Sequence, residues 1–362
     1  MSVTTEQVKL VLAQVQVADL RTDLVSAGMV KDIQVTEDQV MIDIEFGYPA
    51  KSQWTDLRSQ VVAMIRNMPG VGNVSVSVGQ KIIAHAVKPG LKPLAGVRNI
   101  VAVASGKGGV GKSTTTVNLA LALAAEGAQV GVLDADIYGP SLPTMLGLQG
   151  RPESTDGKTM MPLQSHGLQA NSIGLMVEKD QAMIWRGPIA TQALEQLLRQ
   201  TNWSSLDFLL IDMPPGTGDI HLTLTQNVPV TGAIVVTTPQ EIALMDARKG
   251  LKMFEKVSVP VLGIVENMSM HCCSNCGHVE HIFGEGGGQQ MSHDYKVPLL
   301  GSLPLSRSIR EQADSGRPTL VAEPNGPIAD IYKAVARQVA IAVSKIGKDH
   351  ASKFPSIVIE KI

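Results

Sequence analysis

The spacing of apolar and polar positions predicts two differently organised parts of the chain. In residues 1–87, short helical patterns and short alternating runs occur side by side, which predicts a small α+β unit. The expected helices cover residues 5–18 and 57–65, and the expected strands cover residues 33–36, 40–46 and 74–78. Residues 88–96 read KPGLKPLAG, and their proline and glycine content predicts a linker.

From residue 97 onward, short apolar runs alternate with longer helical patterns. The expected strands cover residues 99–104, 129–133, 209–212, 233–237, 261–265 and 299–303, and the expected helices cover residues 115–125, 241–254 and 327–345. This alternation is typical of a doubly wound, mainly parallel α/β sheet, which binds ligands at the carboxyl ends of its strands. We expect this domain to span residues 97–348, with a tail at residues 349–362.

Composition narrows the class of protein. Aromatic residues make up only 3% of the chain, so the core must be aliphatic, which suits a parallel sheet covered on both faces. The formal net charge of −2 gives no sign of nucleic acid or an anionic membrane as a partner. The chain shows no basic-then-apolar leader and no apolar run long enough for a membrane helix, so we expect a cytoplasmic protein.

Residues 106–114 carry the most informative motif. They read GKGGVGKST, which fits the phosphate-binding pattern G-x-x-x-x-G-K-[ST] between a predicted strand and a predicted helix. Glycines let backbone N–H groups surround phosphate oxygens, and the helix N-terminus adds partial positive charge. We expect Lys112 to reach the β- and γ-phosphates and Ser113 to bind Mg²⁺. The candidate nucleotide-binding residues are Gly106, Lys107, Gly108, Gly109, Val110, Gly111, Lys112, Ser113 and Thr114.

Carboxylates end two of the expected strands. Asp212 opens DMPPGTGD, where a carboxylate fits the second Mg²⁺-coordinating position; a helix N-cap is the alternative. Asp134 and Asp136 end another strand, and we expect Asp136 to orient the attacking water or hold metal-bound water. The alternative there is a loop of solvated acids and turn residues.

Lys107 is a second lysine at the entrance of the phosphate loop. We predict that it stabilises transition-state charge on the nucleotide of a facing subunit, as an arginine finger does. A solvated loop lysine is the alternative. Together with Lys112 and Asp136, Lys107 completes the candidate catalytic set.

The three cysteines fall within five positions, at Cys272, Cys273 and Cys276. They cannot form a disulfide framework, and they indicate a reducing compartment and metal or redox chemistry. Two thiolates spaced as C-x-x-C can grip a soft metal centre. Nearby histidines leave a structural zinc site open, whereas a thioredoxin-like pair would open a helix rather than lie in a Gly- and His-rich loop. The histidines are His271, His278 and His281.

These motifs resemble a known superfamily. KGGVGKST at residues 107–114 resembles the deviant phosphate loop of the ParA/MinD/nitrogenase-iron-protein ATPases. DADIYGPS at residues 134–141 and DMPPGTGD at residues 212–219 resemble the signatures of its Mrp/ApbC-type iron–sulfur cluster carriers. The resemblance covers residues 97–345 and implies a P-loop fold and ATP hydrolysis coupled to cluster transfer.

The same resemblance implies particular partners and ligands. It implies a homodimer in which Lys107 acts across the interface. It also implies a [4Fe–4S] cluster that bridges the two subunits and is held by Cys273 and Cys276 of each. Cys272 is then an extra thiol. Cluster donors and iron–sulfur apoproteins are the implied partners. The resemblance also assigns Asn267, in the run ENMS, and residues after a later strand to the adenine.

The first 87 residues resemble a small accessory domain of bacterial members and of PaaD-type assembly factors. The resemblance is carried by GMVKDI at residues 28–33 and MPGV at residues 68–71. Some relatives have Cys-Pro where this chain has Tyr48 and Pro49, so we expect docking or regulation here rather than metal binding.

Two other functions fit parts of the sequence. A positioning ATPase of the MinD or ParA kind would need a basic amphipathic helix or a basic face, but residues 348–355 are weakly basic and broken by proline. A metabolic P-loop ligase or kinase with structural zinc is the second alternative.

Overall fold

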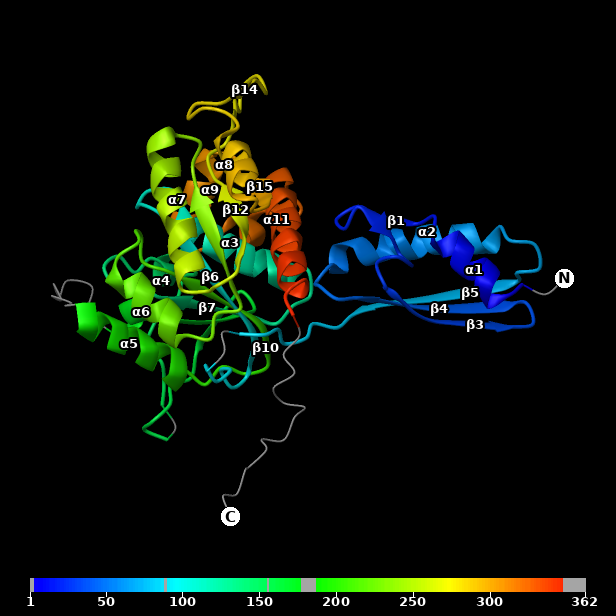
Figure 1. The fold of residues 1–362 in the computed structure, drawn as a ribbon, viewed down its shortest axis with the longest axis horizontal. Coiled ribbons are helices and arrows are strands. Elements are labelled where there is room, and N and C mark those ends of the chain that lie inside the picture. Colours follow the sequence, from blue (N-terminus) through cyan, green and yellow to red (C-terminus); the bar gives the residue numbers. More distant parts are fainter. Residues whose placement is uncertain (1–2, 88–89, 155, 177–186, 348–362) are drawn as a thin grey trace, which may run out of the picture.

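The computed structural model describes residues 3–87, 90–154, 156–176 and 187–347 (Figure 1). A large α/β body carries most of the chain, and a smaller unit built from the first 80 residues lies beside it. The expected tail at residues 349–362 and the start of the expected linker, residues 88–89, lie outside the described residues.

An eight-stranded sheet forms the centre of the large body within the described residues. Its order is β15-β12-β11-β6-β10-β7-β9-β8, and every neighbouring pair is parallel except the edge pair β8 and β9. The strands are β6 (Val97–Ser105), β7 (Val130–Asp134), β8 (Leu163–Ser165), β9 (Leu168–Ser172), β10 (Leu206–Asp212), β11 (Gly232–Thr237), β12 (Val261–Glu266) and β15 (Leu299–Ser302). The prediction of a doubly wound, mainly parallel sheet is confirmed.

Helices cover both faces of this sheet. They are α3 (Lys112–Ala125), α4 (Leu142–Met145), α5 (Gly187–Gln200), α6 (Asp219–Asn227), α7 (Glu241–Lys256), α8 (Gly287–Tyr295), α9 (Arg307–Asp314), α10 (Thr319–Ala322) and α11 (Pro327–Ser344), with a 3₁₀ turn at Ile173–Leu175. Alternate residues of β6 enter opposite cores: Val101 and Val103 pack with α3 and α11, whereas Ile100 and Ala102 pack with α5 and α7. Among the described residues, no helix combines the length and the hydropathy that a bilayer crossing requires.

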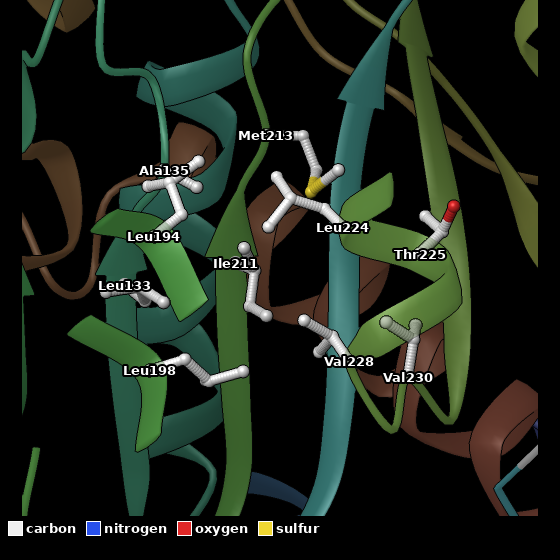
Figure 2. Close-up of a pocket in the computed structure, with 10 residues that line it drawn as sticks. All are labelled: Leu133, Ala135, Leu194, Leu198, Ile211, Met213, Leu224, Thr225, Val228 and Val230. Carbon is white, nitrogen blue, oxygen red and sulfur yellow. The ribbon is translucent and has the colours of Figure 1, made fainter. Parts of the chain in front are cut away.

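The core under α5 and α6 contains one small apolar cavity (Figure 2). Its volume is about 10 Å³, so it holds no ligand larger than a water molecule, and its apolar walls disfavour even that. The side chains around it belong to β7, β10, α5, α6 and the adjoining loops: Leu133, Ala135, Leu194, Leu198, Ile211, Met213, Leu224, Thr225, Val228 and Val230. This cavity is a packing feature of the core rather than a functional site.

The smaller unit is a three-stranded sheet with two helices. Its elements are α1 (Thr5–Leu12), β1 (Gln16–Val17), β2 (Thr22–Asp23), β3 (Val30–Thr36), β4 (Gln39–Phe46), a 3₁₀ turn (Lys51–Gln53), α2 (Trp54–Arg66) and β5 (Asn73–Gln80). In the three-stranded sheet, β4 pairs antiparallel with β3 and parallel with β5. Its alternating residues Val40, Ile42, Ile44 and Phe46 are buried, which confirms the strand predicted there.

The predicted helix over residues 5–18 is wrong in its second half. A capping box between Thr4 and Gln7 starts the helix as expected, but α1 ends at Leu12. Beyond it, backbone bonds from Gln14 to Val11 and from Val15 to Leu12 turn the chain toward β1. Val15 is buried because this turn places it in the core, although the helix has already ended. Its helix-like position in the apolar pattern therefore reflects tertiary packing and not a longer helix.

A buried ion network joins the smaller unit to the large body. Arg337 of α11 contacts Asp19 through Nε and Glu126 through Nη1, each at 2.7 Å. Glu126 directly follows α3, is fully buried, and also accepts a 2.7 Å hydrogen bond from Ser52 Oγ. The smaller unit therefore docks at the end of α3 opposite the phosphate loop.

Replacement of Arg337 should loosen this interface. Arg337→Ala leaves the Glu126 carboxylate buried without its cation, and loss of one partner of a buried pair costs about 3–5 kcal/mol. We expect a lower free energy of unfolding in urea and faster proteolysis between residues 81 and 96. Arg307→Ala, which removes an exposed pair with Glu311, is the control and should cost less than about 1 kcal/mol. Equal losses in the two variants would contradict a structural role for the network.

Candidate functional site

The phosphate loop joins the end of β6 to the start of α3, as its sequence predicts. Gly109 and Gly111 have positive φ values of 83° and 80°, which turn the backbone around the loop. A Cβ atom on Gly111 would lie 2.2 Å from Asn267 Nδ2, and this clash adds to the strain that the positive φ imposes on any other residue. A cavity of about 210 Å³ opens at the loop, and its lining includes Lys107, Lys112 and Ser113.

Asp212 is fully buried behind Lys112 and Ser113, which line this cavity, and three neighbours hold its carboxylate. Ser113 Oγ donates to Asp212 Oδ2 at 2.6 Å, Thr116 Oγ1 donates to Oδ1 at 2.8 Å, and Lys112 Nζ lies 2.8 Å from Oδ2. The N-cap of α6 is Gly218, so the interpretation of Asp212 as a helix cap is wrong. A serine hydroxyl beside a fixed carboxylate is an oxygen donor set of the kind that Mg²⁺ prefers. Thr116, which is one helical turn beyond Lys112, was not among the residues predicted from the sequence.

The two acids after β7 have different environments. Asp134 is fully buried and accepts hydrogen bonds from the backbone of Asp136 and Leu142 and from Ser172 Oγ, which fixes the loop. Burial, aided by the Asp212 carboxylate, raises the pKa of Asp134 to about 7. Asp136 lines the phosphate cavity with Oδ2 3.8 Å from Lys112 Nζ. Burial raises its pKa, while Lys112 opposes the shift. Both acids are buried, so the solvated-loop alternative is wrong.

Lys107 stands at the entrance of the same cavity. It is half-buried, and its ammonium has no hydrogen-bond or ion-pair partner among the described residues. Ser105 Oγ donates to its carbonyl oxygen at 2.9 Å, which fixes the backbone while leaving the side chain available. Lys107 is therefore a cation beside the phosphate loop whose ammonium has no partner in the described part of the chain.

A second cavity of about 210 Å³ adjoins the phosphate loop and shares Gly111 and Thr114 with it. Asn267 is on its wall, buried, and donates from Nδ2 to the Val110 carbonyl oxygen at 2.9 Å. The rest of the wall consists of residues to which the sequence assigned no contact with a nucleotide: Met145, Met268, Pro304, Leu305, Ser306, Ile309, Arg310, Ala313, Asp314 and Tyr332. Several of them follow the carboxyl end of β15, which agrees with the residues after a later strand that the resemblance implied without numbers. We call this cavity the nucleoside pocket, because the resemblance assigns Asn267 to the adenine.

The cysteines lie on a short hairpin that projects from the body beside α8 (Figure 1). It consists of β13 (His271–Cys272) and β14 (Val279–Glu280) with a tight turn between them. Backbone N–H groups of Asn275 and Cys276, together with the Cys276 thiol, point at Cys273 Sγ and lower the pKa of the Cys273 thiol. The Cys272 thiol instead donates to the Gly277 carbonyl oxygen at 3.6 Å. We call residues 271–281 the cysteine hairpin.

Two histidines near the thiols bind backbone oxygens. His271 Nδ1 donates to the Leu305 carbonyl oxygen at 3.0 Å, and His281 Nδ1 donates to the Ser269 carbonyl oxygen at 2.8 Å. Within the described residues, no three His, Cys, Asp or Glu side chains form a group able to hold a metal ion. The zinc alternative, which needs a histidine beside two cysteines, finds no such ligand set there. Two thiols supply half of the four that a [4Fe–4S] cluster needs.

A phosphate loop between β6 and α3, with carboxylates at the ends of β7 and β10 and a lysine at the loop entrance, defines a P-loop NTPase of the ParA type. The chain belongs to the NUBPL iron-transfer P-loop NTPase family, whose model matches residues 96–340. A second family model, for iron–sulfur cluster assembly proteins, matches residues 5–78. The resemblance found in the sequence is thereby confirmed.

Curated relatives are similar over most of their length. An iron–sulfur cluster carrier protein from Escherichia coli (strain K12) is 51% identical over 330 residues, which are 91% of this chain and 89% of the relative. The iron–sulfur cluster transfer protein NUBPL of Mus musculus is 50% identical over 253 residues, covering 69% of this chain and 79% of the relative.

Solved structures confirm the fold. A nucleotide-binding protein from Archaeoglobus fulgidus in complex with ADP superposes with a TM-score of 0.57 at 36% identity, covering 65% of this chain and 92% of that one. The cell-division ATPase MinD from Pyrococcus furiosus gives a TM-score of 0.50 at 24% identity, with 67% and 98% covered. This second likeness is one of fold alone.

Proposed function

We propose that this protein hydrolyses ATP and carries a [4Fe–4S] cluster, which it transfers to iron–sulfur apoproteins in the cytoplasm. The observation that carries the proposal is a projecting pair of thiols, one of them acidified by backbone N–H groups, on a body with a complete phosphate loop. Relatives named as cluster carriers support it. An exposed site with few ligands per chain releases its cargo easily, which suits a carrier.

The incomplete sites support a homodimer. One chain offers Cys273 and Cys276 where four thiolates are needed, and the Lys107 ammonium has no partner among the residues that the structure describes. Ile242 and Met245 on α7 are 69% and 52% exposed, and the backbone of Asp246 packs against the first glycine of the phosphate loop. Exposed apolar side chains beside a site indicate a surface that another protein covers. A second copy that covers this end would supply the missing thiolates and receive Lys107.

In the proposed reaction, water attacks the γ-phosphorus, the bond to the ADP oxygen breaks, and phosphate leaves. Lys112 exchanges its contact with Asp212 for the β- and γ-phosphate oxygens, while Ser113 and Asp212 hold Mg²⁺. The ion, when bound, neutralises charge on the phosphates. Asp136 accepts a hydrogen bond from the attacking water, and Asn267 and its neighbours hold the adenine. Lys107 of the opposite subunit stabilises charge that develops in the transition state.

The chain divides, in this proposal, into an accessory domain at residues 1–87, a linker at residues 88–96 and the carrier domain at residues 97–348. The two family models, which match residues 5–78 and 96–340, support that division. The accessory domain docks on α3 and α11, far from the hairpin of β13 and β14 (Figure 1), so a role in contacting cluster donors or acceptors suits it better than metal binding.

Anaerobic reconstitution tests the proposed function. The wild-type chain should take up about four irons and four sulfides per two chains, because two thiolates come from each. Iron, sulfide and zinc are measured together with the visible charge-transfer absorption and the mass of the species in solution. Tight stoichiometric zinc, with no cluster accepted, would overturn the carrier proposal in favour of structural zinc.

If Lys107 acts across the interface, its replacement should reduce ATP hydrolysis far more than ATP binding. Lys107→Ala should bind ATP within about threefold of the wild type but hydrolyse it at least about 10²-fold more slowly, since the lost contact forms in the transition state. Mixing Lys107→Ala with Lys112→Ala should restore part of the activity, because one site of each mixed dimer has an intact loop and an intact facing lysine. Heterodimers that form but stay inactive would refute this role.

A further inference from the structure

The segment after β12 contacts both candidate sites. Asn267 binds the Val110 carbonyl oxygen of the phosphate loop, and Met268 lines the nucleoside pocket. Met268 has a φ of 55°, a left-handed conformation that a side chain seldom adopts, so the chain turns sharply there. Ser269 then donates from its backbone N–H and from Oγ to the Leu303 carbonyl oxygen, at 3.0 and 3.1 Å. This turn brings the chain from the nucleotide to the base of the cysteine hairpin.

Leu305 forms a second connection. It lines the nucleoside pocket, and its backbone N–H donates to the Met270 carbonyl oxygen at 2.7 Å. Its own carbonyl oxygen accepts the 3.0 Å hydrogen bond from His271 Nδ1. A wall residue of the pocket is therefore bonded directly to a residue of the cysteine hairpin.

His281 fastens the other end of the same hairpin. Its Nδ1 donates to the Ser269 carbonyl oxygen at 2.8 Å, two residues beyond Asn267. Both imidazoles must carry their proton on Nδ1, because a carbonyl oxygen only accepts. The cysteine hairpin thus rests on two ring-to-backbone bonds, one at each end, and both end on segments that border the nucleoside pocket.

We propose that His271 and His281 are positioning residues that couple the cysteine hairpin to nucleotide in the pocket. The inference deepens the proposed function and rests on it, since it names how ATP acts on the cluster-binding loop. A bound nucleotide contacts Asn267, Met268 and Leu305 and restricts their backbone. The two rings pass this restriction to the hairpin and so to Cys273 and Cys276. A contiguous path of packed and hydrogen-bonded groups is a physical route for such coupling, and coupling between two binding sites is reciprocal.

Hydrogen exchange on the full-length, cluster-free chain tests the coupling without iron. Adding Mg²⁺ and ADP to the wild type should slow amide exchange in the cysteine hairpin, residues 271–281, by about fivefold or more. In His271→Ala/His281→Ala this slowing should disappear, while the Kd for ADP stays within about threefold of the wild type. His271→Asn/His281→Asn should restore it, because the asparagine Nδ2 can donate from a similar position. His278→Ala is the matched control, since that exposed ring on the same hairpin has no hydrogen-bond partner among the described residues.

Two results would overturn the proposal. One is an unchanged exchange rate in the wild-type hairpin at saturating ADP. The other is full slowing in the double alanine variant with ADP bound. Neither measurement involves a cluster. A chain that takes up no iron would therefore contradict the proposed function without affecting this test.

Discussion

Cys273→Ala and Cys276→Ala are each expected to abolish cluster binding. Each change removes two of the four thiolates from a bridged dimer, and no His, Asp or Glu among the described residues is placed with the remaining thiols to replace them. Iron and sulfide after anaerobic reconstitution should fall from about four per dimer to background, and the visible absorption should vanish. ADP affinity should stay within about threefold of the wild type, because the phosphate loop is built from other elements.

Cys272→Ala is the matched control for these two variants. Its thiol is bonded to the Gly277 carbonyl oxygen rather than to the Cys273–Cys276 pair, so its loss should leave most of the cluster in place. If Cys272→Ala lost the cluster while Cys273→Ala kept it, the assignment of the ligand pair would be wrong.

Lys112→Ala is expected to weaken ADP and ATP binding by about 10²–10³-fold. The change removes charge-assisted hydrogen bonds to phosphate that are worth about 3–4 kcal/mol together. Hydrolysis should fall below detection. Isothermal titration with ADP and a phosphate-release assay measure the two effects separately.

Lys112 also has a structural role, so its replacement needs a control for stability. In the structure Lys112 neutralises Asp212 in a buried site, so thermal unfolding of the variant must be recorded with its affinity. Lys252→Ala removes an exposed cation from α7 and should change neither quantity. Wild-type turnover in a folded Lys112→Ala would refute the phosphate-loop assignment.

Local sequence was sufficient for the parts of the fold whose apolar pattern is regular. The buried strands β6, β10 and β11 and the helices α3 and α11 lie within a few residues of their predicted ranges, because continuous apolar runs and helical spacing are local signals. β9 was missed because Asn171 and Ser172 are fully buried polar residues there. Their burial is satisfied by Thr201 and Asp134, which are distant in sequence.

The candidate site likewise has parts that the sequence predicts and parts that depend on tertiary structure. The phosphate loop is contiguous, so spacing alone indicated its residues. The placement of Asp212 against Ser113 depends on the pairing of β10 with β6, which no local pattern encodes. The hydrogen-bond partners of His271 and His281 could not be predicted from the sequence either. Their position near the cysteines suggested metal ligands, whereas in the fold both rings donate to backbone carbonyl oxygens.

The most direct test of the central claim is cluster transfer from the reconstituted wild-type protein to the apo form of a [4Fe–4S] enzyme. An iron chelator is present throughout, so only a cluster passed intact can activate the acceptor. The account predicts that acceptor activity rises as the visible absorption of the carrier falls, and that Cys273→Ala gives no activation. Acceptor activity that never exceeds the level with free iron and sulfide plus chelator would contradict it.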